Sequence, residues 1–153
     1  MTSEDRTARA NRVILGAAAL FLLDLFLPWQ RVEMRMPAAI DIRDTASGWS
    51  GWGALAGVCA IALLVVVIAV RETPAIPALA LGVLLCTTLE VLAGNAHVTV
   101  NAAMMRTQVD TTLWPAWVGL ALAGATAAAA AVPYLATPGE RRPPTAPVPH
   151  GRG

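Results

Sequence analysis

Two acidic residues, Asp24 and Glu90, lie inside long apolar runs of this sequence. Each stands about one helical turn from the outer end of its run, so two membrane-crossing helices would hold both acids at a similar depth. A charge at the centre of a bilayer costs about 2.5–3.5 kcal/mol, so such residues pair, protonate or face the bundle interior. His97 follows Glu90 on the same helical face. Asp24, Glu90 and His97 therefore form a candidate ion or proton site.

A second interpretation of these acids needs no transported ion. Either carboxylate could accept a hydrogen bond from a neighbouring helix, or form a salt bridge with an outer arginine such as Arg31 or Arg106. A single histidine at a helix end commonly forms an interfacial hydrogen bond. The structural and the functional interpretation both stay open.

Other reactive side chains are sparse. Cys59 and Cys86 lie in two consecutive apolar runs, and a helical hairpin would place them at one depth as small buried side chains. The sequence has no C-x-x-C motif, no cluster of metal ligands and no nucleophile–base set. We therefore expect no catalytic residue, no metal, no cofactor and no enzyme activity. A net charge of +1 gives no basic surface for nucleic acid.

The elements that must position these residues are four apolar helices. The 153-residue chain is 56% hydrophobic and 14% charged, with a mean hydropathy of +0.59, which suits a bilayer better than water. A membrane-crossing helix needs about 20 apolar residues. Runs of this kind predict helices over residues 13–28, 52–70, 75–95 and 113–136. The predicted fold class is an all-α membrane protein, a four-transmembrane-helix bundle spanning residues 13–136.

Arginine placement predicts the orientation of this bundle. With residues 1–12 in the cytoplasm, the inner segments hold Arg6, Arg9, Arg12, Arg71, Arg141, Arg142 and Arg152. The outer loops, residues 29–51 and 96–112, hold only Arg31, Arg35, Arg43 and Arg106. Because inner segments carry the excess of basic residues, both termini should be cytoplasmic in a multi-pass protein of the cytoplasmic membrane. The Pro-rich tail, residues 137–153, should be disordered.

The first outer loop has the alternation of a strand pair. Val32 and Met34 alternate with charged residues, and Ile40 and Ile42 do the same after Pro37. This period of two predicts a small extracytoplasmic β-hairpin cap that turns near Pro37 and covers the mouth of the bundle. In the second loop, residues 97–100 either add a strand or extend the third helix.

All five tryptophans stand at the outer ends of the predicted helices. Indole rings prefer the headgroup zone, where the ring is apolar and the N–H reaches a polar partner. The sequence therefore predicts a one-sided outer aromatic collar made of Trp29, Trp49, Trp52, Trp114 and Trp117.

Small residues indicate which helix faces pack. Helix two contains Gly53-x-x-x-Gly57, and helix three repeats small or polar residues from Gly82 to Gly94. Glycine lets two helices approach closely in a membrane, so these four residues are expected to mediate helix packing, within the chain or in a dimer.

The stretches "DLFLPWQRV" and "GWSGWG" carry a resemblance. The first half of the chain resembles a group of small, functionally uncharacterised four-helix membrane proteins of high-GC Gram-positive bacteria. Its members share L-P-W at the end of helix one and a Gly/Trp-rich entrance to helix two. The layout is also similar to that of claudins, with a Trp-rich first loop, although this loop is short and lacks a cysteine pair. The resemblance implies the fold and no catalytic residue.

These features predict an accessory, scaffolding or modulating membrane component of the cell envelope. Its partners would be the lipid bilayer and either another membrane protein or a second copy of the chain. The alternative is a small transporter or ion-coupled protein that uses Asp24 and Glu90.

Overall fold

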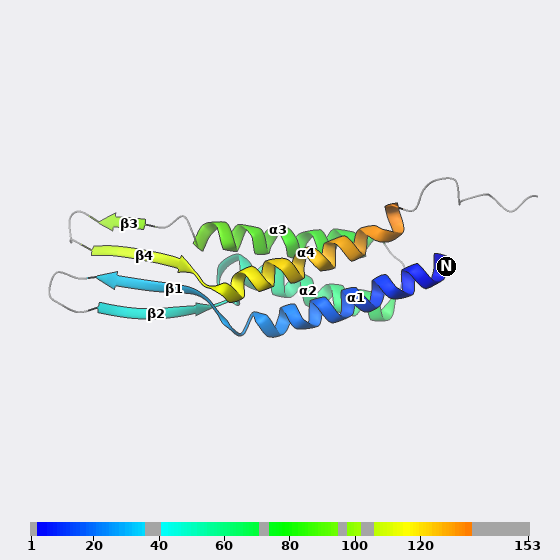
Figure 1. The fold of residues 1–153 in the computed structure, drawn as a ribbon, viewed down its shortest axis with the longest axis horizontal. Helices are drawn as coiled ribbons and strands as arrows, with labels where there is room; N and C mark the ends of the chain where they lie inside the picture. The colour runs from blue at the N-terminus through cyan, green and yellow to red at the C-terminus, as the bar shows by residue number, and fades with distance from the viewer. Residues whose placement is uncertain (1–2, 36–40, 71–73, 95–97, 102–105, 136–153) are drawn as a thin grey trace, which may run out of the picture.

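The computed structural model describes residues 3–35, 41–70, 74–94, 98–101 and 106–135, which form four helices and four strands (Figure 1). In chain order these are α1 (Ser3–Asp24), β1 (Pro28–Arg35), β2 (Asp41–Ser47), α2 (Gly51–Ala69), α3 (Ala75–Gly94), β3 (Val98–Asn101), β4 (Arg106–Thr112) and α4 (Trp114–Leu135). The helices form a bundle, and the sheet continues from one end of it along the same long axis (Figure 1). The start of α1 and the end of α4 lie at the opposite end.

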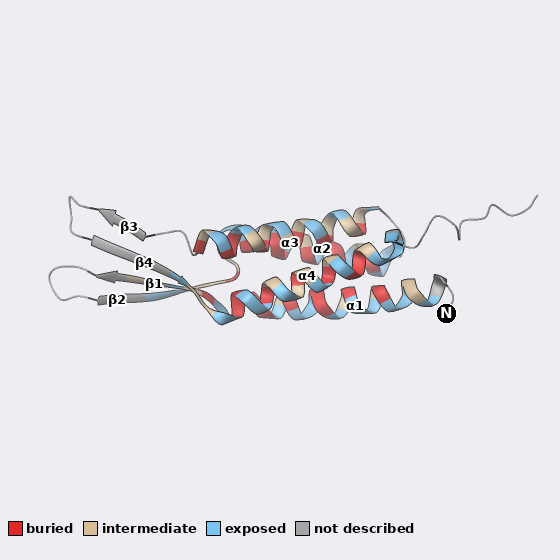
Figure 2. Cartoon of the chain, turned by 45° about the horizontal axis from the view of Figure 1, so that its top comes forward, coloured by how far each residue is buried: buried red, intermediate tan, exposed pale blue. Residues whose placement is uncertain are grey.

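The four helices pack as a ring in which α1 and α3 each contact both α2 and α4. Three helices, α2, α3 and α4, are long and apolar enough to cross a membrane. The buried residues line the inward sides of the helices, and the outer sides are exposed (Figure 2). Large apolar side chains occupy these outer sides: Leu23 is 66% exposed, Ile68 69% and Leu92 60%. A helix that is apolar on all sides is typical of a lipid-facing bundle.

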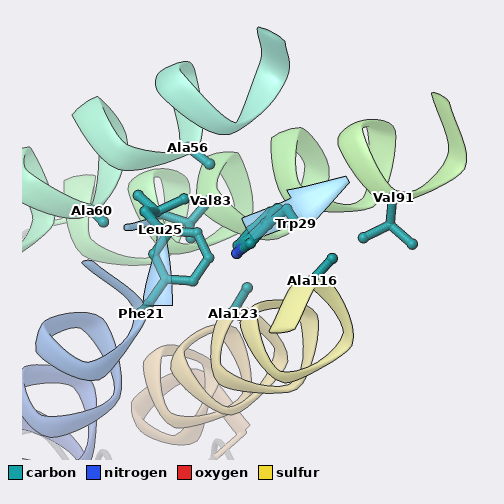
Figure 3. Packing of buried hydrophobic residues seen from close by; sticks show 9 residues of the cluster. All are labelled: Phe21, Leu25, Trp29, Ala56, Ala60, Val83, Val91, Ala116 and Ala123. Carbon is teal, nitrogen blue, oxygen red and sulfur yellow. The ribbon is translucent and has the colours of Figure 1, made fainter. Parts of the chain in front are cut away.

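Two clusters of buried side chains fill the interior. The cluster next to the sheet consists of Phe21, Leu25, Trp29, Ala56, Ala60, Val83, Val91, Ala116 and Ala123 (Figure 3). Phe21 and Trp29 meet edge to face, with ring centroids 6.1 Å apart, which is a favourable arrangement of two aromatic quadrupoles. The alanines let the helices approach closely enough to enclose these two rings. The second cluster, farther from the sheet, contains Ile14, Leu63, Val67, Ile76, Ala80, Ala129 and Ala130.

The first helix differs from its predicted bounds of 13–28. It begins ten residues earlier, at Ser3, because polar residues continue the helix and Ala10 and Ile14 are buried against the bundle. Residues 3–12 form the first part of α1. The helix ends at Asp24, where a turn follows and Leu27 N donates to Asp24 O at 2.9 Å. The other three helices begin and end within one residue of the expected bounds, and residues 137–153 lie outside the described residues.

The predicted hairpin of the first loop is confirmed, but it is half of a larger sheet. The strand order is β2-β1-β4-β3 and neighbouring strands are antiparallel, so Arg31 pairs with both Thr45 and Thr111. In the second loop, Val98–Asn101 forms a strand and does not extend α3. The described strands continue away from the helices (Figure 1), so the predicted hairpin lying across the bundle mouth is wrong. Pro37 lies outside the described residues.

Candidate functional site at the junction of bundle and sheet

Glu90 lies in the last part of α3 and connects three elements through its carboxylate. Its Oε1 accepts a hydrogen bond from Gln30 Nε2 of β1 at 2.8 Å. Its Oε2 accepts from the backbone N–H groups of Trp52 at 2.7 Å and Gly53 at 3.4 Å, both in the first turn of α2. The side chain is only 5% exposed. Glu90 therefore holds α2, α3 and β1 together at the bundle–sheet junction.

The start of α2 explains why a carboxylate is needed there. The first N–H groups of a helix have no partner within the helix, and the helix dipole makes this end attractive to an anion. Ser50 stands at the N-cap position but makes no side-chain cap. Glu90 takes the place of that cap from a different helix. Gly51 has φ of 52°, and a Cβ there would lie 2.6 Å from Glu90 Oε2, so glycine leaves space for the carboxylate.

The end of α3 also meets the two central strands closely. A Cβ on Gly94 would lie 2.9 Å from Thr112 Oγ1 and 3.0 Å from Gln30 Nε2. Gly94 was expected to mediate helix–helix packing, but it packs against the sheet. The Thr112 hydroxyl is buried here without a hydrogen-bond partner among the described residues. Gln30, Glu90 and Thr112 thus make the junction between α3 and the sheet polar.

Asp24 ends α1 in a different environment. It is 6% exposed, and its Oδ2 has no hydrogen-bond partner among the described residues. The Trp29 indole N–H donates to the backbone carbonyl of Asp24 at 3.1 Å. A Cβ on Gly119 of α4 would lie 2.8 Å from Asp24 Oδ2 and 2.5 Å from the Trp29 ring. The Asp24 carboxyl is therefore packed against the Trp29 indole and the backbone of α4.

The two acids occupy the same end of the bundle, but they have separate partners. Glu90 bonds Gln30 and the start of α2, whereas Asp24 packs with Trp29 and Gly119. His97 lies outside the described residues, so its predicted place in an ion or proton site with Glu90 stays a prediction. Over the described part of the chain, no three His, Cys, Asp or Glu side chains form a group that could hold a metal ion.

The five tryptophans differ in exposure: three are exposed, one is half-buried and one is fully buried. Trp52, Trp114 and Trp117 are 47%, 69% and 53% exposed, as an aromatic collar at a membrane interface requires. Trp29 does not belong to this exposed set, because it is fully buried in the core. Glycines make this burial possible: a Cβ on Gly48 would lie 2.7 Å from the Trp29 ring, and one on Gly119 would lie 2.5 Å from it. Trp49 is half-buried and meets Phe26 edge to face at 5.7 Å.

The other glycines singled out in the sequence pack within the chain. Gly53 lies against the backbone carbonyl of Gly48, so it closes the turn that enters α2. A Cβ on Gly57 would lie 2.6 Å from the Trp49 ring and 3.0 Å from Leu25 of the α1 end. Gly82 faces Cys59 Sγ at ordinary contact distance, which brings α3 against α2. Cys59 and Cys86 are both free thiols.

Three residues of the junction were not singled out in the sequence: Gln30, Thr112 and Gly119. Gln30 has no distinguishing signal, because one glutamine in an alternating strand looks like a solvent-facing residue. Gly48 and Gly51 belong to the quoted Gly/Trp stretch, but their partners are distant in the chain.

No protein-family model, curated protein or solved structure matches this chain.

Proposed function

We propose that this chain is a non-catalytic scaffold of the cell envelope, which holds a four-stranded sheet in a fixed orientation outside the cytoplasmic membrane. The observation that carries the proposal is the set of hydrogen bonds at Glu90. Both carboxylate oxygens are occupied by donors of the protein itself. An acid used in this way acts as a structural joint between bundle and sheet.

The hydrogen bonds of Glu90 favour a rigid attachment of the sheet to the helix bundle. A hydrogen bond that is shielded from water is stronger than an exposed one, and each buried donor left without its partner costs about 1–3 kcal/mol. Rotation of the sheet relative to the bundle would break the Gln30–Glu90 bond and expose the first N–H groups of α2. The edge strand β2 pairs only with β1 among the described residues, and Asp44 and Thr45 on it are exposed. An unpaired strand edge of this kind can accept a strand from a partner protein.

The membrane placement rests on three arguments. Three helices are long and apolar enough to span, and α1 packs beside α2 and α4, which supports four spans. Trp52, Trp114 and Trp117 are exposed at the sheet end, which supports an interface at that level. The excess of arginine in the segments assigned to the inner side supports cytoplasmic termini and a sheet outside the membrane. Reporter fusions after Arg71 and at the C-terminus should both read cytoplasmic; an external reading would overturn this topology.

A photo-crosslinking amino acid at Asp44 tests the scaffold function in intact cells. We expect one discrete adduct from this edge position, and its loss when Glu90→Ala loosens the sheet. The double substitution Gln30→Glu with Glu90→Gln, which re-forms the side-chain bond with the carboxylate on the strand, should restore the adduct. The absence of an adduct, or an adduct that is indifferent to Glu90→Ala, would contradict a role for the held sheet.

The second candidate is a small ion-coupled transporter, and the buried, unpartnered Oδ2 of Asp24 favours it. Purified protein in vesicles that contain a pH-sensitive dye separates the two functions. A scaffold gives no flux that depends on Asp24 or Glu90. A proton flux that Asp24→Asn abolishes in a folded protein would establish the transporter instead.

A further inference from the structure

The carboxyl of Asp24 is a buried titratable group to which the scaffold function assigns no role. More than nine-tenths of the residue is hidden from solvent, and Oδ2 has no hydrogen-bond partner among the described residues. Trp29, which belongs to the apolar core cluster, and Gly119 of α4 lie next to it. An ionised carboxylate with one buried oxygen unpartnered is costly in such surroundings, and the cost is removed when the group binds a proton.

Among the described residues of the helices that pack around Asp24, no basic side chain lies near it in the sequence. In α1 itself the last arginine is Arg12, about three helical turns away. The sequences of α2 and α4 contain no charged residue, and α3 contains only Glu90, which is bonded to Gln30 and α2. On β1 the nearest base is Arg31, which is exposed, and Cys59 of α2 and Cys86 of α3 are free thiols.

We propose that the Asp24 carboxyl is a proton-binding site and carries its proton in the folded protein. The ligand is one proton from the aqueous phase, which forms an O–H bond with a carboxylate oxygen and leaves a neutral acid; no other bond forms or breaks. This charge state does not depend on whether the protein is a scaffold. The neutral form is what allows Trp29 and Gly119 to close over the side chain.

Release of this proton has a structural consequence. A carboxylate at residue 24 needs water, and separating Trp29 from Gly119, which lie too close together to admit even a Cβ on residue 119, would let water reach it. That contact joins β1 to α4, and Leu113 N, just before α4, donates to Trp29 O at 2.7 Å. Alkaline pH should therefore loosen the attachment of the two central strands, while the Glu90 joint is still formed.

Infrared spectroscopy of the full-length protein in lipid tests the proton directly. We expect a protonated-carboxyl C=O band at neutral pH that is lost in Asp24→Asn and kept in Glu90→Gln, because both Glu90 oxygens act as acceptors. Carboxyl ¹³C-labelling of aspartate in the unsubstituted protein should shift the same band, which keeps the test valid if Asp24→Asn does not fold. A missing band, or a band that disappears with Glu90 or ignores the aspartate label, would overturn the proposal.

The pH dependence of unfolding gives a second readout. The folded protein would bind a proton that the unfolded chain releases near neutral pH, so raising the pH favours unfolding. The melting temperature of the unsubstituted protein in detergent should therefore fall more steeply toward alkaline pH than that of Asp24→Asn. Parallel pH profiles for the two proteins would overturn the proton site, whereas the flux and crosslinking results above would be unaffected.

Discussion

Gln30 and Glu90 are 60 residues apart in the chain, and their side chains meet in a hydrogen bond of 2.8 Å. One lies at the start of the first strand and the other near the end of the third helix, so the bond joins the sheet to the bundle. Glu90 simultaneously accepts from the N-terminus of α2. This single carboxylate thus binds donors from two other elements, α2 and β1.

Removal of the Glu90 carboxylate should destabilise the protein. Glu90→Ala leaves the Gln30 amide and the Trp52 N–H without their partner, with an expected loss of about 1–3 kcal/mol for each unsatisfied group. Glu90→Gln should lose less, because its amide oxygen can still accept from Trp52 N if Gln30 rotates its own amide. Thermal unfolding in detergent measures both losses.

The reversed pair is the control for this prediction. Gln30→Glu together with Glu90→Gln keeps a carboxylate–amide bond, and the double variant should be more stable than Glu90→Ala by a measurable margin. If Glu90→Ala melts at the same temperature as the unsubstituted protein, Glu90 is not the joint described above.

Gly119 and Gly124 on α4 offer a matched pair of substitutions. A Cβ on Gly119 would overlap the Trp29 ring at 2.5 Å and Asp24 Oδ2 at 2.8 Å, whereas one on Gly124 would meet nothing within 4 Å. We expect Gly119→Ala to destabilise by about 1–3 kcal/mol, because α4 must move away from a packed core. Gly124→Ala should be neutral or stabilising, since alanine favours a helix. Equal effects of the two changes on the melting temperature would contradict the packing of Trp29 under α4.

The buried and the exposed tryptophans should behave differently on replacement. Trp29→Ala removes a ring that is wholly enclosed, with an expected loss of about 3–5 kcal/mol. Trp117→Ala removes a ring that is 53% exposed and should change the melting temperature little. In variants that keep one tryptophan and replace the other four by phenylalanine, lipids brominated near the headgroup should quench the fluorescence of Trp117. The same lipids should leave the fluorescence of Trp29 unaffected. Strong quenching of Trp29 fluorescence by these lipids would contradict its burial and would show that it lies at the membrane interface.

The sequence was sufficient for elements whose signal is local. Apolar runs of about 20 residues located α2, α3 and α4 because membrane helices must be long and apolar. The alternation of apolar and charged residues located the β1–β2 hairpin, because successive side chains of a strand point to opposite faces. The pairing of β1 with β4 was not predictable, because it joins residues such as Arg31 and Thr111 across two helices, and β4, "RTQVDTT", has almost no apolar alternation.

The site was predictable only in part. Asp24 and Glu90 stand out because acids are rare in apolar runs, but their partners do not. Gln30 has no local signal, and the role of Gly119 depends on a ring that enters the core from β1. Trp29 was assigned to the interface because tryptophan at a helix end usually lies there. It is buried because α1 stops four residues before Pro28 and the chain turns the next side chain inward.

The distance between the sheet and the bundle is the most direct test of the central claim that Glu90 fixes their orientation. Pulsed dipolar spectroscopy measures this distance between spin labels at Asp44→Cys on β2 and Ala125→Cys on α4, which are both exposed positions. The two free cysteines, Cys59 and Cys86, are first replaced by alanine. We predict one narrow distance distribution in lipid, which broadens with Glu90→Ala and narrows again with the reversed Gln30→Glu, Glu90→Gln pair. A broad distribution in the otherwise unsubstituted protein, or a narrow one that survives Glu90→Ala, would contradict the account.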